Sequence, residues 1–282
     1  MPTKPSGWYG TISLDAAPDM TLLASLRDEW TALEAELDLW AEAGRVASFW
    51  WRDDDATDVT PPLERLLRLK DSTRTPLTLA VIPGLATEAL ASRLDGSPGL
   101  TVVQHGFAHR NHAPAGEKKC EFPASRPLQQ RIDDLRAGEK SLGTLFPRRL
   151  RVLVPPWNRI ADMAGDLATM GFIALSGFGL RRHPFAAPGL IQLNTHIDPV
   201  DWRGGDVTSG CRTALKQAVL CLQRQRGDVA LQQPLGLLTH HLRHDDTGWD
   251  FIAAFVELIG RHPGAEWTGL ERALKIGLPP RP

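Results

Sequence analysis

The chain has 282 residues, of which 42% are hydrophobic and 23% are charged, so it is long enough to bury a substantial core. Its formal net charge is −1 and no basic block stands out, which argues against a nucleic-acid-binding surface. The three cysteines are scattered, the N-terminal sequence has no apolar leader, and no apolar run is long enough to cross a bilayer. We therefore expect a cytoplasmic protein without a nucleic-acid or membrane partner, and its oligomeric state stays open.

The first predicted element is a helix over residues 20–45, where leucine and tryptophan recur at helical spacing and Gly44 marks the end. Short apolar stretches of strand type then alternate with amphipathic helical stretches. Seven strands are predicted, at residues 46–51, 77–82, 100–104, 150–154, 172–176, 190–195 and 235–238. Helices are predicted at residues 61–69, 85–94, 126–145, 160–170, 214–226 and 249–261. Thr60 is the expected N-cap of the first of these helices, and residues 177–189 are expected to form a surface loop.

Strands that are apolar on both faces and alternate with helices indicate a parallel sheet covered by helices. Seven such strands fit a closed or nearly closed α/β barrel better than a small open sheet. We expect residues 46–282 to form the barrel domain and residues 1–45 to form an N-terminal helical extension. The active site of such barrels lies at the C-terminal ends of the strands, so polar residues at those ends are the candidates for function.

Three polar clusters follow predicted strands. Residues 52–55 are Arg-Asp-Asp-Asp, residues 105–109 are His-Gly-Phe-Ala-His, and residues 239–241 are Thr-His-His. One carboxylate and two imidazoles can hold a zinc-like ion and leave a position open for water. A second carboxylate and a distant histidine can then serve as base and acid. Acidic turns and paired histidines also occur on ordinary surfaces, but their position after strands favours a hydrolytic metal site.

The residues alone leave some assignments open. Successive strand side chains point to opposite faces, so the three aspartates at residues 53–55 cannot all enter the site unless the chain turns there. Arg52 is expected to keep a neighbouring carboxylate ionised. At most one of His240 and His241 is expected to face the catalytic water, while the other packs or binds a carboxylate.

Further candidates lie beside these clusters. Trp157 offers a flat ring on which a sugar can stack, and Asn158 can donate a hydrogen bond to a polarised oxygen. The pair Asp201-Trp202 is a similar aromatic and polar candidate. We group Trp157, Asn158 and Trp202 with Arg52 as expected substrate contacts. His112 and His196 are weaker candidates. His112 supports the ligands or lies on the surface, and His196 lines the pocket or is structural.

These residues resemble the motifs of the polysaccharide deacetylase (NodB-homology) family, carbohydrate esterase family 4, and more closely its divergent bacterial branch. The family motif Thr-Phe-Asp-Asp-Gly is similar to residues 52–56, and the His-x-x-x-His motif is similar to residues 105–109. The Arg-Pro-Pro-Tyr-Gly motif resembles residues 154–158, and the Leu-rich strand that ends in His resembles residues 237–240. The resemblance covers residues 46–267 and keeps the motif order of the family.

The resemblance implies a distorted (β/α)7 barrel that hydrolyses an N-acetyl or related amide. Carried over onto this chain, it makes Asp54 the base and His240 the acid. Asp55, His105 and His109 then hold a divalent metal, with zinc favoured and cobalt or nickel tolerated. A shift of the first motif by one residue would instead make Asp53 the base and Asp54 the metal ligand.

Two departures from the family pattern bear on the site. Val154 occupies the place of the arginine that normally orients the base, so Arg52 is a candidate to replace it. Ala56 replaces a glycine, which narrows the conformational range of the turn. The leading functional hypothesis is metal-dependent removal of an acetyl group from an N-acetylated sugar or oligosaccharide. The alternatives are a small-molecule amidohydrolase on the same fold and a non-catalytic carbohydrate-binding barrel.

Overall fold

The computed structural model describes residues 20–228, 231–276 and 278, and the N-terminal residues in which we expect no leader lie outside these ranges. The strands are β1 (Ala47–Ala56), β2 (Leu77–Val81), β3 (Leu100–His105), β4 (Val152–Val154), β5 (Ala174–Leu175), β6 (Phe185–Ala187), β7 (Leu190–Gln192), β8 (Leu235–Thr239) and β9 (Ala265–Trp267). The helices are α1 (Met20–Ser25), α2 (Arg27–Glu42), α3 (Pro61–Thr73), α4 (Glu88–Leu94), α5 (Leu128–Leu145), the 3-10 turn η1 (Pro156–Asn158), α6 (Ala164–Thr169), α7 (Val207–Gly227), α8 (Asp246–Arg261) and α9 (Leu270–Ala273).

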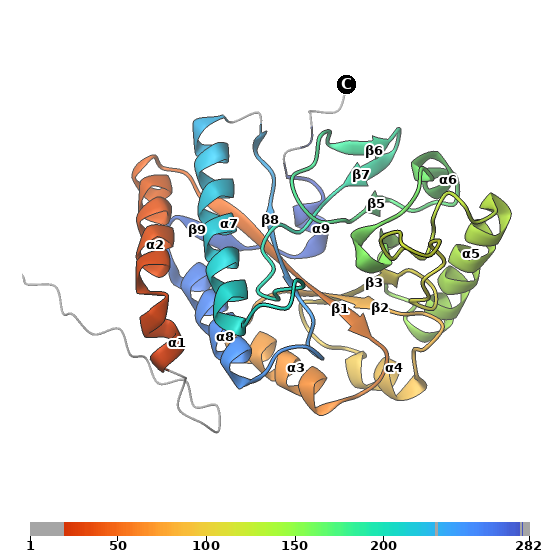
Figure 1. Cartoon of the computed structure of the whole chain (residues 1–282), viewed down its shortest axis with the longest axis horizontal. Helices are drawn as coiled ribbons and strands as arrows, with labels where there is room; N and C mark the ends of the chain where they lie inside the picture. The colour runs from red at the N-terminus through yellow and green to blue at the C-terminus, as the bar shows by residue number, and fades with distance from the viewer. Residues whose placement is uncertain (1–19, 229–230, 277, 279–282) are drawn as a thin grey trace, which may run out of the picture.

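The strands form one nine-stranded sheet in the order β6-β7-β5-β4-β3-β2-β1-β8, with β9 paired to the beginning of β1. Neighbouring strands are parallel except β6 and β7. Figure 1 shows helices around this sheet, with α7 and α8 on one side, α5 and α6 on the opposite side, and α3 and α4 between them. The predicted α/β architecture is confirmed.

The two ends of the sheet meet through residues 193–197, which follow β7. On one side this segment hydrogen-bonds to β5 and to the residues just after it. On the other side His196 and Ile197 both donate their backbone N–H groups to the carbonyl oxygen of Gly236 in β8, at 2.7 and 3.0 Å. A side chain at Gly236 would be blocked, because a Cβ there would lie 2.6 Å from the Cα of Thr195. The sheet thereby becomes a distorted barrel.

The N-terminal helices α1 and α2 pack onto the outside of this barrel. Leucines of both helices and Trp40 are buried in the same apolar cluster as residues of α7 and α8. Trp30 contacts Phe251 of α8 with ring centroids 5.4 Å apart. Glu36 is 3% exposed and receives two hydrogen bonds from Arg226 of α7, at 2.7 and 3.1 Å. These contacts join residues 20–42 to α7 and α8, which follow residues 193–197 in the chain.

Several predicted elements need correction. The predicted loop at residues 177–189 contains β6, because Phe185–Ala187 pairs with β7. Helix α7 begins at Val207 rather than at residue 214, because the Asp206 side chain accepts the N–H of Ser209 and caps the helix there. Strand β9 and helix α9 were not predicted at all, since each is only three or four residues long. Thr60 caps α3 as predicted.

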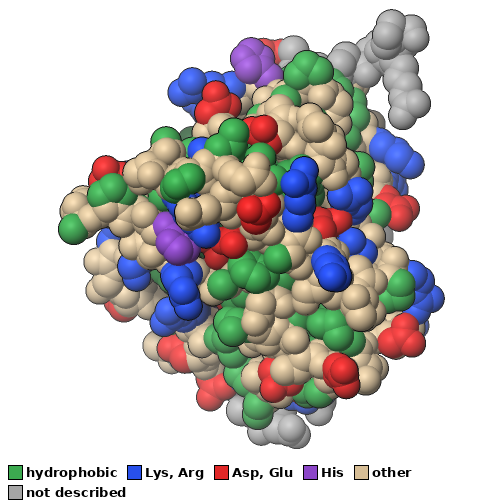
Figure 2. All heavy atoms as spheres, turned by 90° about the vertical axis from the view of Figure 1, so that its right-hand side faces the viewer, with side chains coloured by type: hydrophobic (Ala, Val, Ile, Leu, Met, Phe, Trp, Pro, Cys, Tyr) green, Lys and Arg blue, Asp and Glu red, His purple; other side chains and the backbone are tan. Residues whose placement is uncertain are grey.

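No helix among the described residues is both long and apolar enough to cross a membrane. Acidic and basic side chains are interspersed over the face of the molecule that carries α5 and α6 (Figure 2).

Candidate active site

Polar residues from the C-terminal ends of β1, β3 and β8 meet around one cavity of about 680 Å³. This volume lies in the range typical of small-ligand sites. The lining includes both expected catalytic residues and all three expected metal ligands, namely Asp54, His240, Asp55, His105 and His109. The parallel sheet explains this convergence, because the C-terminal ends of its strands lie at one edge.

Strand β1 does not end before the acidic cluster as predicted but continues through it to Ala56. The alternation of side chains therefore places Asp53 on the opposite face from Arg52 and Asp54. The register of β1 against β2 shifts between Asp53 and Ala56, and Asp55 has a left-handed backbone with φ 74°. This irregularity turns Asp55 toward the cavity beside Asp54, so two of the three aspartates line the site.

The side chains of Asp55, His105 and His109 form a compact donor cluster. The Nε2 atoms of His105 and His109 lie 3.1 and 3.3 Å from Oδ1 of Asp55, and one donor atom from each residue lies within 4.8 Å of the others. Nδ1 of His105 donates to the carbonyl oxygen of Val154 at 3.0 Å, which leaves Nε2 of this ring to face the cluster. Two imidazole nitrogens and one carboxylate oxygen are a donor set that suits a divalent transition metal.

The electrostatics of the cluster are set by the carboxylate of Asp55 and the imidazoles around it. Burial raises the pKa of Asp55, but the hydrogen bond from His105 and the charges of His105, His240 and His109 outweigh burial and lower the pKa well below its usual range. Burial lowers the pKa of His105, but the charges of Asp54 and Asp55 outweigh it and raise the pKa. Burial and the charge of His105 lower the pKa of His109. A positive charge is therefore favoured beside the carboxylate of Asp55.

Left-handed backbone conformations concentrate at the site. Five described residues other than glycine have positive φ, and four of them line the cavity, namely Asp55, His109, Trp157 and Asn158. Such conformations cost free energy for side chains with a Cβ and persist only where surrounding contacts impose them. In this fold these backbone conformations direct side chains into the cavity. The rings of Trp157 and His109, for example, meet there with centroids 4.4 Å apart.

Arg52 has no exposed surface, so the expectation that it contacts substrate is wrong. Its Nε lies 2.9 Å from Oδ1 of Asp54, and its Nη2 donates to Oδ2 of the same carboxylate at 3.0 Å. Nη2 also donates to Oδ1 of Asn158 at 2.8 Å, and Nη1 donates to Oγ of Ser176 at 2.7 Å. Every side of the guanidinium is occupied by protein, and the carboxylate that it holds is that of Asp54.

Asp53 and His241 form a separate buried pair behind the cavity. Oδ1 of Asp53 lies 2.5 Å from Nδ1 of His241, and Oδ2 accepts hydrogen bonds from the hydroxyl of Thr239 and the backbone N–H of His241. Both side chains are at most 1% exposed. This pair joins β1 to the end of β8 and therefore fixes the position of His240, the next residue along. Neither side chain of the pair lines the cavity.

His240 faces the cavity from the end of β8. Its ring meets that of Trp202 edge to face, with centroids 4.8 Å apart, and its buried Nδ1 has no hydrogen-bond partner among the described residues. Nε1 of Trp202 donates to Oδ2 of Asp198 at 2.8 Å. Burial raises the pKa of Asp198, although the charge of His240 lowers it. Through the hydrogen bond to Nε1, Asp198 holds the Trp202 ring that packs against His240.

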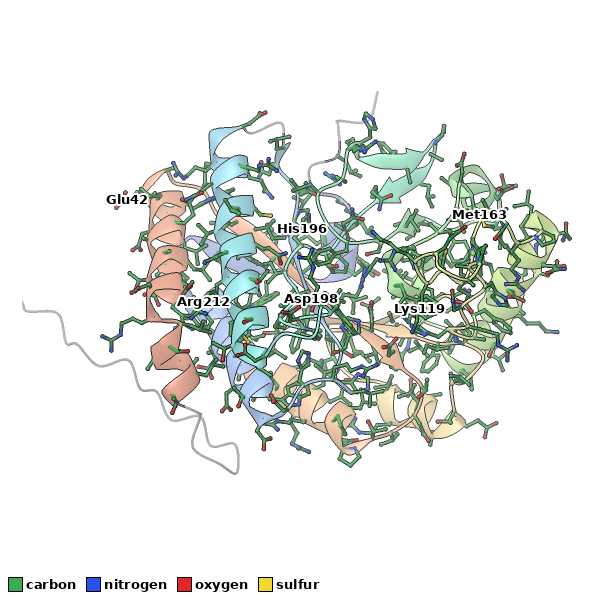
Figure 3. All side chains as sticks on the ribbon, viewed as in Figure 1. Glu42, Lys119, Met163, His196, Asp198 and Arg212 are labelled. Carbon is green, nitrogen blue, oxygen red and sulfur yellow. The ribbon has the colours of Figure 1, made fainter. Side chains whose placement is uncertain are left out.

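The remaining candidates divide between the cavity and its surroundings. Trp157, Asn158 and Trp202 line the cavity, whereas His112 and His196 do not. His196 is 3% exposed and has hydrogen bonds on both ring nitrogens, so it serves the barrel closure. In Figure 3, His196 and Asp198 both lie near the centre of the view, on the connection from β7 to α7.

Several lining residues escaped the sequence analysis, namely Arg159, Phe178, Asp198, Val200, Arg203, Gly210, Thr213, Gln217 and Arg243. Asp198 had a signal, because it stands four residues before Trp202, directly after the stretch at residues 190–195 that was predicted as a strand. The arginines and Phe178 had none, because exposed residues of these types occur over most protein surfaces.

No family model matches this sequence, and no curated protein sequence matches it. Solved structures do match. A candidate polysaccharide deacetylase from Mycobacterium smegmatis is 14% identical, with a TM-score of 0.58 over 82% of this chain and 90% of that chain. A peptidoglycan N-acetylglucosamine deacetylase is 14% identical, with a TM-score of 0.53 over 82% of this chain and 89% of that chain. This chain has the polysaccharide deacetylase fold.

This likeness confirms the fold that the motif resemblance implies. The same fold also carries a CE4 family pseudoenzyme from Bacillus anthracis, which is 12% identical, with a TM-score of 0.51 over 82% of this chain and 66% of that chain. A mutant of that pseudoenzyme has restored enzymatic activity. The residues at the site, rather than the fold, therefore decide whether such a barrel is a catalyst.

Proposed function

We propose that this protein is a metal-dependent hydrolase that removes the acetyl group from an N-acetylated sugar or oligosaccharide. The observation that carries the proposal is the juxtaposition, in one cavity, of the donor cluster around Asp55 with a second carboxylate and a remote histidine. This second carboxylate, that of Asp54, is held by a buried arginine, and the histidine is His240. A metal site, a base and an acid are the parts that amide hydrolysis needs.

The donor chemistry fits a divalent metal ion. Asp55, His105 and His109 supply one oxygen and two nitrogen donors, a set that favours zinc and tolerates cobalt or nickel. When bound, such an ion polarises the carbonyl group of the substrate and lowers the pKa of water.

The remaining roles fall to side chains of the chain itself. Asp54 accepts a proton from the attacking water as the water oxygen bonds to the acetyl carbon. Arg52 holds the carboxylate of Asp54 in a fixed orientation through two contacts. His240 gives a proton to the nitrogen of the leaving amine as the carbon–nitrogen bond breaks. The products are acetate and a free amine, and the order of these proton transfers follows general acid–base catalysis.

The cavity walls suit a sugar ring. Trp157 and Trp202 both line the cavity, and Trp202 is 56% exposed, so part of its ring is accessible to a sugar. Oδ1 of Asn158 is occupied by Arg52, which leaves the amide NH2 group to donate to substrate. The cysteines are free, which fits a reducing compartment, and we propose that the enzyme acts in the cytoplasm.

The test combines metal analysis with acetate release. The purified protein should carry about one zinc ion per chain and release acetate from a panel of N-acetylated mono- and oligosaccharides. His105→Ala and His109→Ala should lose both metal and activity, whereas His112→Ala, a neighbouring change outside the cavity, should keep both. Equal metal content in all four proteins would disprove the site. Turnover only of small non-sugar amides would assign the amidohydrolase alternative, and sugar binding without turnover would assign a binding barrel.

A further inference from the structure

Glu121 lies on the connection between β3 and α5 and directs its carboxylate to the segment that carries His109. The side chain has no exposed surface. Oε2 accepts the backbone N–H of Phe107 at 3.1 Å. Oε1 accepts the N–H groups of Ala108 and Arg110 at 2.8 and 3.3 Å. One buried carboxylate therefore binds the backbone on both sides of an expected metal ligand.

The charge of Glu121 is compensated mainly by this segment. The carboxylate forms no ion pair with any Lys, Arg or His side chain in the part of the chain that the structure describes. A buried carboxylate without compensation is very costly, whereas several converging backbone N–H groups form a favourable anion site. The three N–H groups can converge on one carboxylate only if residues 107–110 keep their present curved course.

That course is unusual in its backbone angles. Gly106 has φ 56° and His109 has φ 53°. A Cβ at Gly106 would collide with Oε2 of Glu121, so the carboxylate and the glycine fit only together. Two carbonyl oxygens of the segment are also hydrogen-bonded. The backbone N–H of Gly84 donates to the carbonyl oxygen of Phe107 at 2.7 Å, and Nε2 of Gln104 donates to the carbonyl oxygen of Gly106 at 2.9 Å.

We propose that Glu121 is a positioning residue for metal binding, which holds the backbone of residues 106–110 so that Nε2 of His109 meets Asp55 and His105. This inference rests on the proposed metal site and assigns a role to a residue outside it. Besides holding the course of this segment, the carboxylate of Glu121 would supply a fixed negative charge that favours a bound cation. Groups that orient metal ligands in this way typically contribute about 10- to 100-fold in metal affinity.

The decisive experiment titrates metal-free full-length protein with Co²⁺, whose visible spectrum reports coordination, and with Zn²⁺ in competition. Glu121→Gln keeps the size of the side chain but places an NH2 group against backbone donors. We expect its metal affinity to fall by about 10- to 100-fold. Glu36→Gln is the matched control. It too removes a buried carboxylate that accepts hydrogen bonds, but from the α2–α7 contact, and it should keep wild-type affinity while losing stability.

Amide hydrogen exchange of the metal-free proteins supplies a second readout. The amides of Phe107, Ala108 and Arg110 should exchange faster in Glu121→Gln than in wild type, and at the wild-type rate in Glu36→Gln. If Glu121→Gln yields no folded protein, the same measurements on Glu121→Asp decide, with weaker metal binding supporting the inference and unchanged binding overturning it.

The outcomes separate this inference from the proposed function. Wild-type protein that binds metal while Glu121→Gln binds it equally well would overturn the inference alone. An equal loss of affinity in Glu36→Gln would also overturn it, because the effect would then be one of general stability. Wild-type protein that binds no metal would overturn the proposed function and the inference with it.

Discussion

Arg52 and Asp54, two residues apart on β1, form a two-point contact inside the protein. Nε of Arg52 lies 2.9 Å from Oδ1 of Asp54, and Nη2 lies 3.0 Å from Oδ2. Both side chains are at most 2% exposed. The family motif carries its arginine where this chain has Val154 on β4. The guanidinium here comes instead from the strand of the carboxylate itself, which supports the expectation that Arg52 replaces the missing arginine.

Replacement of Arg52 by lysine should therefore damage catalysis without emptying the metal site. A lysine keeps the charge but cannot contact both oxygens of Asp54 and also reach Asn158 and Ser176. We expect Arg52→Lys to lower kcat by roughly 10- to 100-fold while metal content stays the same. Steady-state kinetics and metal analysis measure both quantities. Arg45→Lys is the control, since the Arg45 side chain lies outside the cavity lining and hydrogen-bonds to carbonyl oxygens of α7. An equal effect there would contradict the role.

The three aspartates at residues 53–55 should respond differently to substitution. Asp55→Ala should lose metal and activity, because two imidazoles alone hold an ion weakly. Asp54→Asn should keep metal and lose activity, because an amide accepts no proton from water. Metal content and acetate release of both variants test these expectations. Loss of metal in Asp54→Asn would favour the alignment shifted by one residue, which makes Asp54 the ligand and Asp53 the base.

Asp53 should behave as a structural residue. Its carboxylate faces away from the cavity and is bound by His241 and Thr239 rather than by Arg52. We expect Asp53→Asn to retain measurable turnover with a lower free energy of unfolding. Urea unfolding beside the kinetics checks this expectation. Complete loss of activity at wild-type stability would contradict it.

The neighbouring histidines should separate catalysis from stability. His240→Ala should lower turnover by roughly 10²- to 10⁴-fold and leave metal bound, because it removes the proton donor for the leaving amine. His241→Ala should reduce turnover much less but lower the free energy of unfolding by about 3–5 kcal/mol, since it leaves the carboxylate of Asp53 buried without its partner. Kinetics and urea unfolding of both variants measure the two effects. The opposite ranking in turnover would identify His241 as the acid.

Acid should weaken the barrel closure through His196. Burial lowers the pKa of His196 to about 4, although the hydrogen bond with Gln233 raises it. Between pH 6.5 and pH 4 the unfolded chain, in which this histidine has its ordinary pKa of 6.5, binds more protons than the folded chain. The contribution of His196 to the free energy of unfolding is therefore fully present above pH 6.5 and falls as the pH drops toward 4. This shift in the pKa of His196 corresponds to about 3 kcal/mol in the free energy of unfolding. Urea unfolding of metal-free protein between pH 7 and pH 4 would reveal the loss.

The variant His196→Asn should make that pH dependence shallower, because its side-chain oxygen can still accept the N–H of Gly236 without titrating. Part of the slope should remain, since burial also lowers the pKa of His244 to about 4. His183→Asn, a change at an exposed histidine, should leave the slope as it is in wild type. An unchanged slope in His196→Asn would exclude His196 as the source of the acid sensitivity.

The order of strands and helices follows from the sequence because each element carries its own local pattern. The apolar runs before Arg52, His105 and Thr239 predict buried strands, and parallel pairing brings their C-terminal ends to one edge. That argument needs no knowledge of tertiary contacts, so the donor cluster and the location of the cavity could be predicted from the sequence. The short elements β6, β9 and α9 were not, because three or four residues carry too little periodicity to predict an element.

The tertiary structure alone decided which side chains enter the site. Alternation along β1 predicts that Asp54 and Asp55 diverge, yet a shift in strand register and a left-handed backbone at Asp55 bring them together. Local preferences disfavour that conformation, so only contacts with β2 and the histidines can impose it. The burial of Arg52 and the reach of Glu121 to the segment before it likewise depend on packing between parts of the chain far apart in sequence. Sequence periodicity determines which face of a strand is apolar, but these long-range contacts determine where each charge lies.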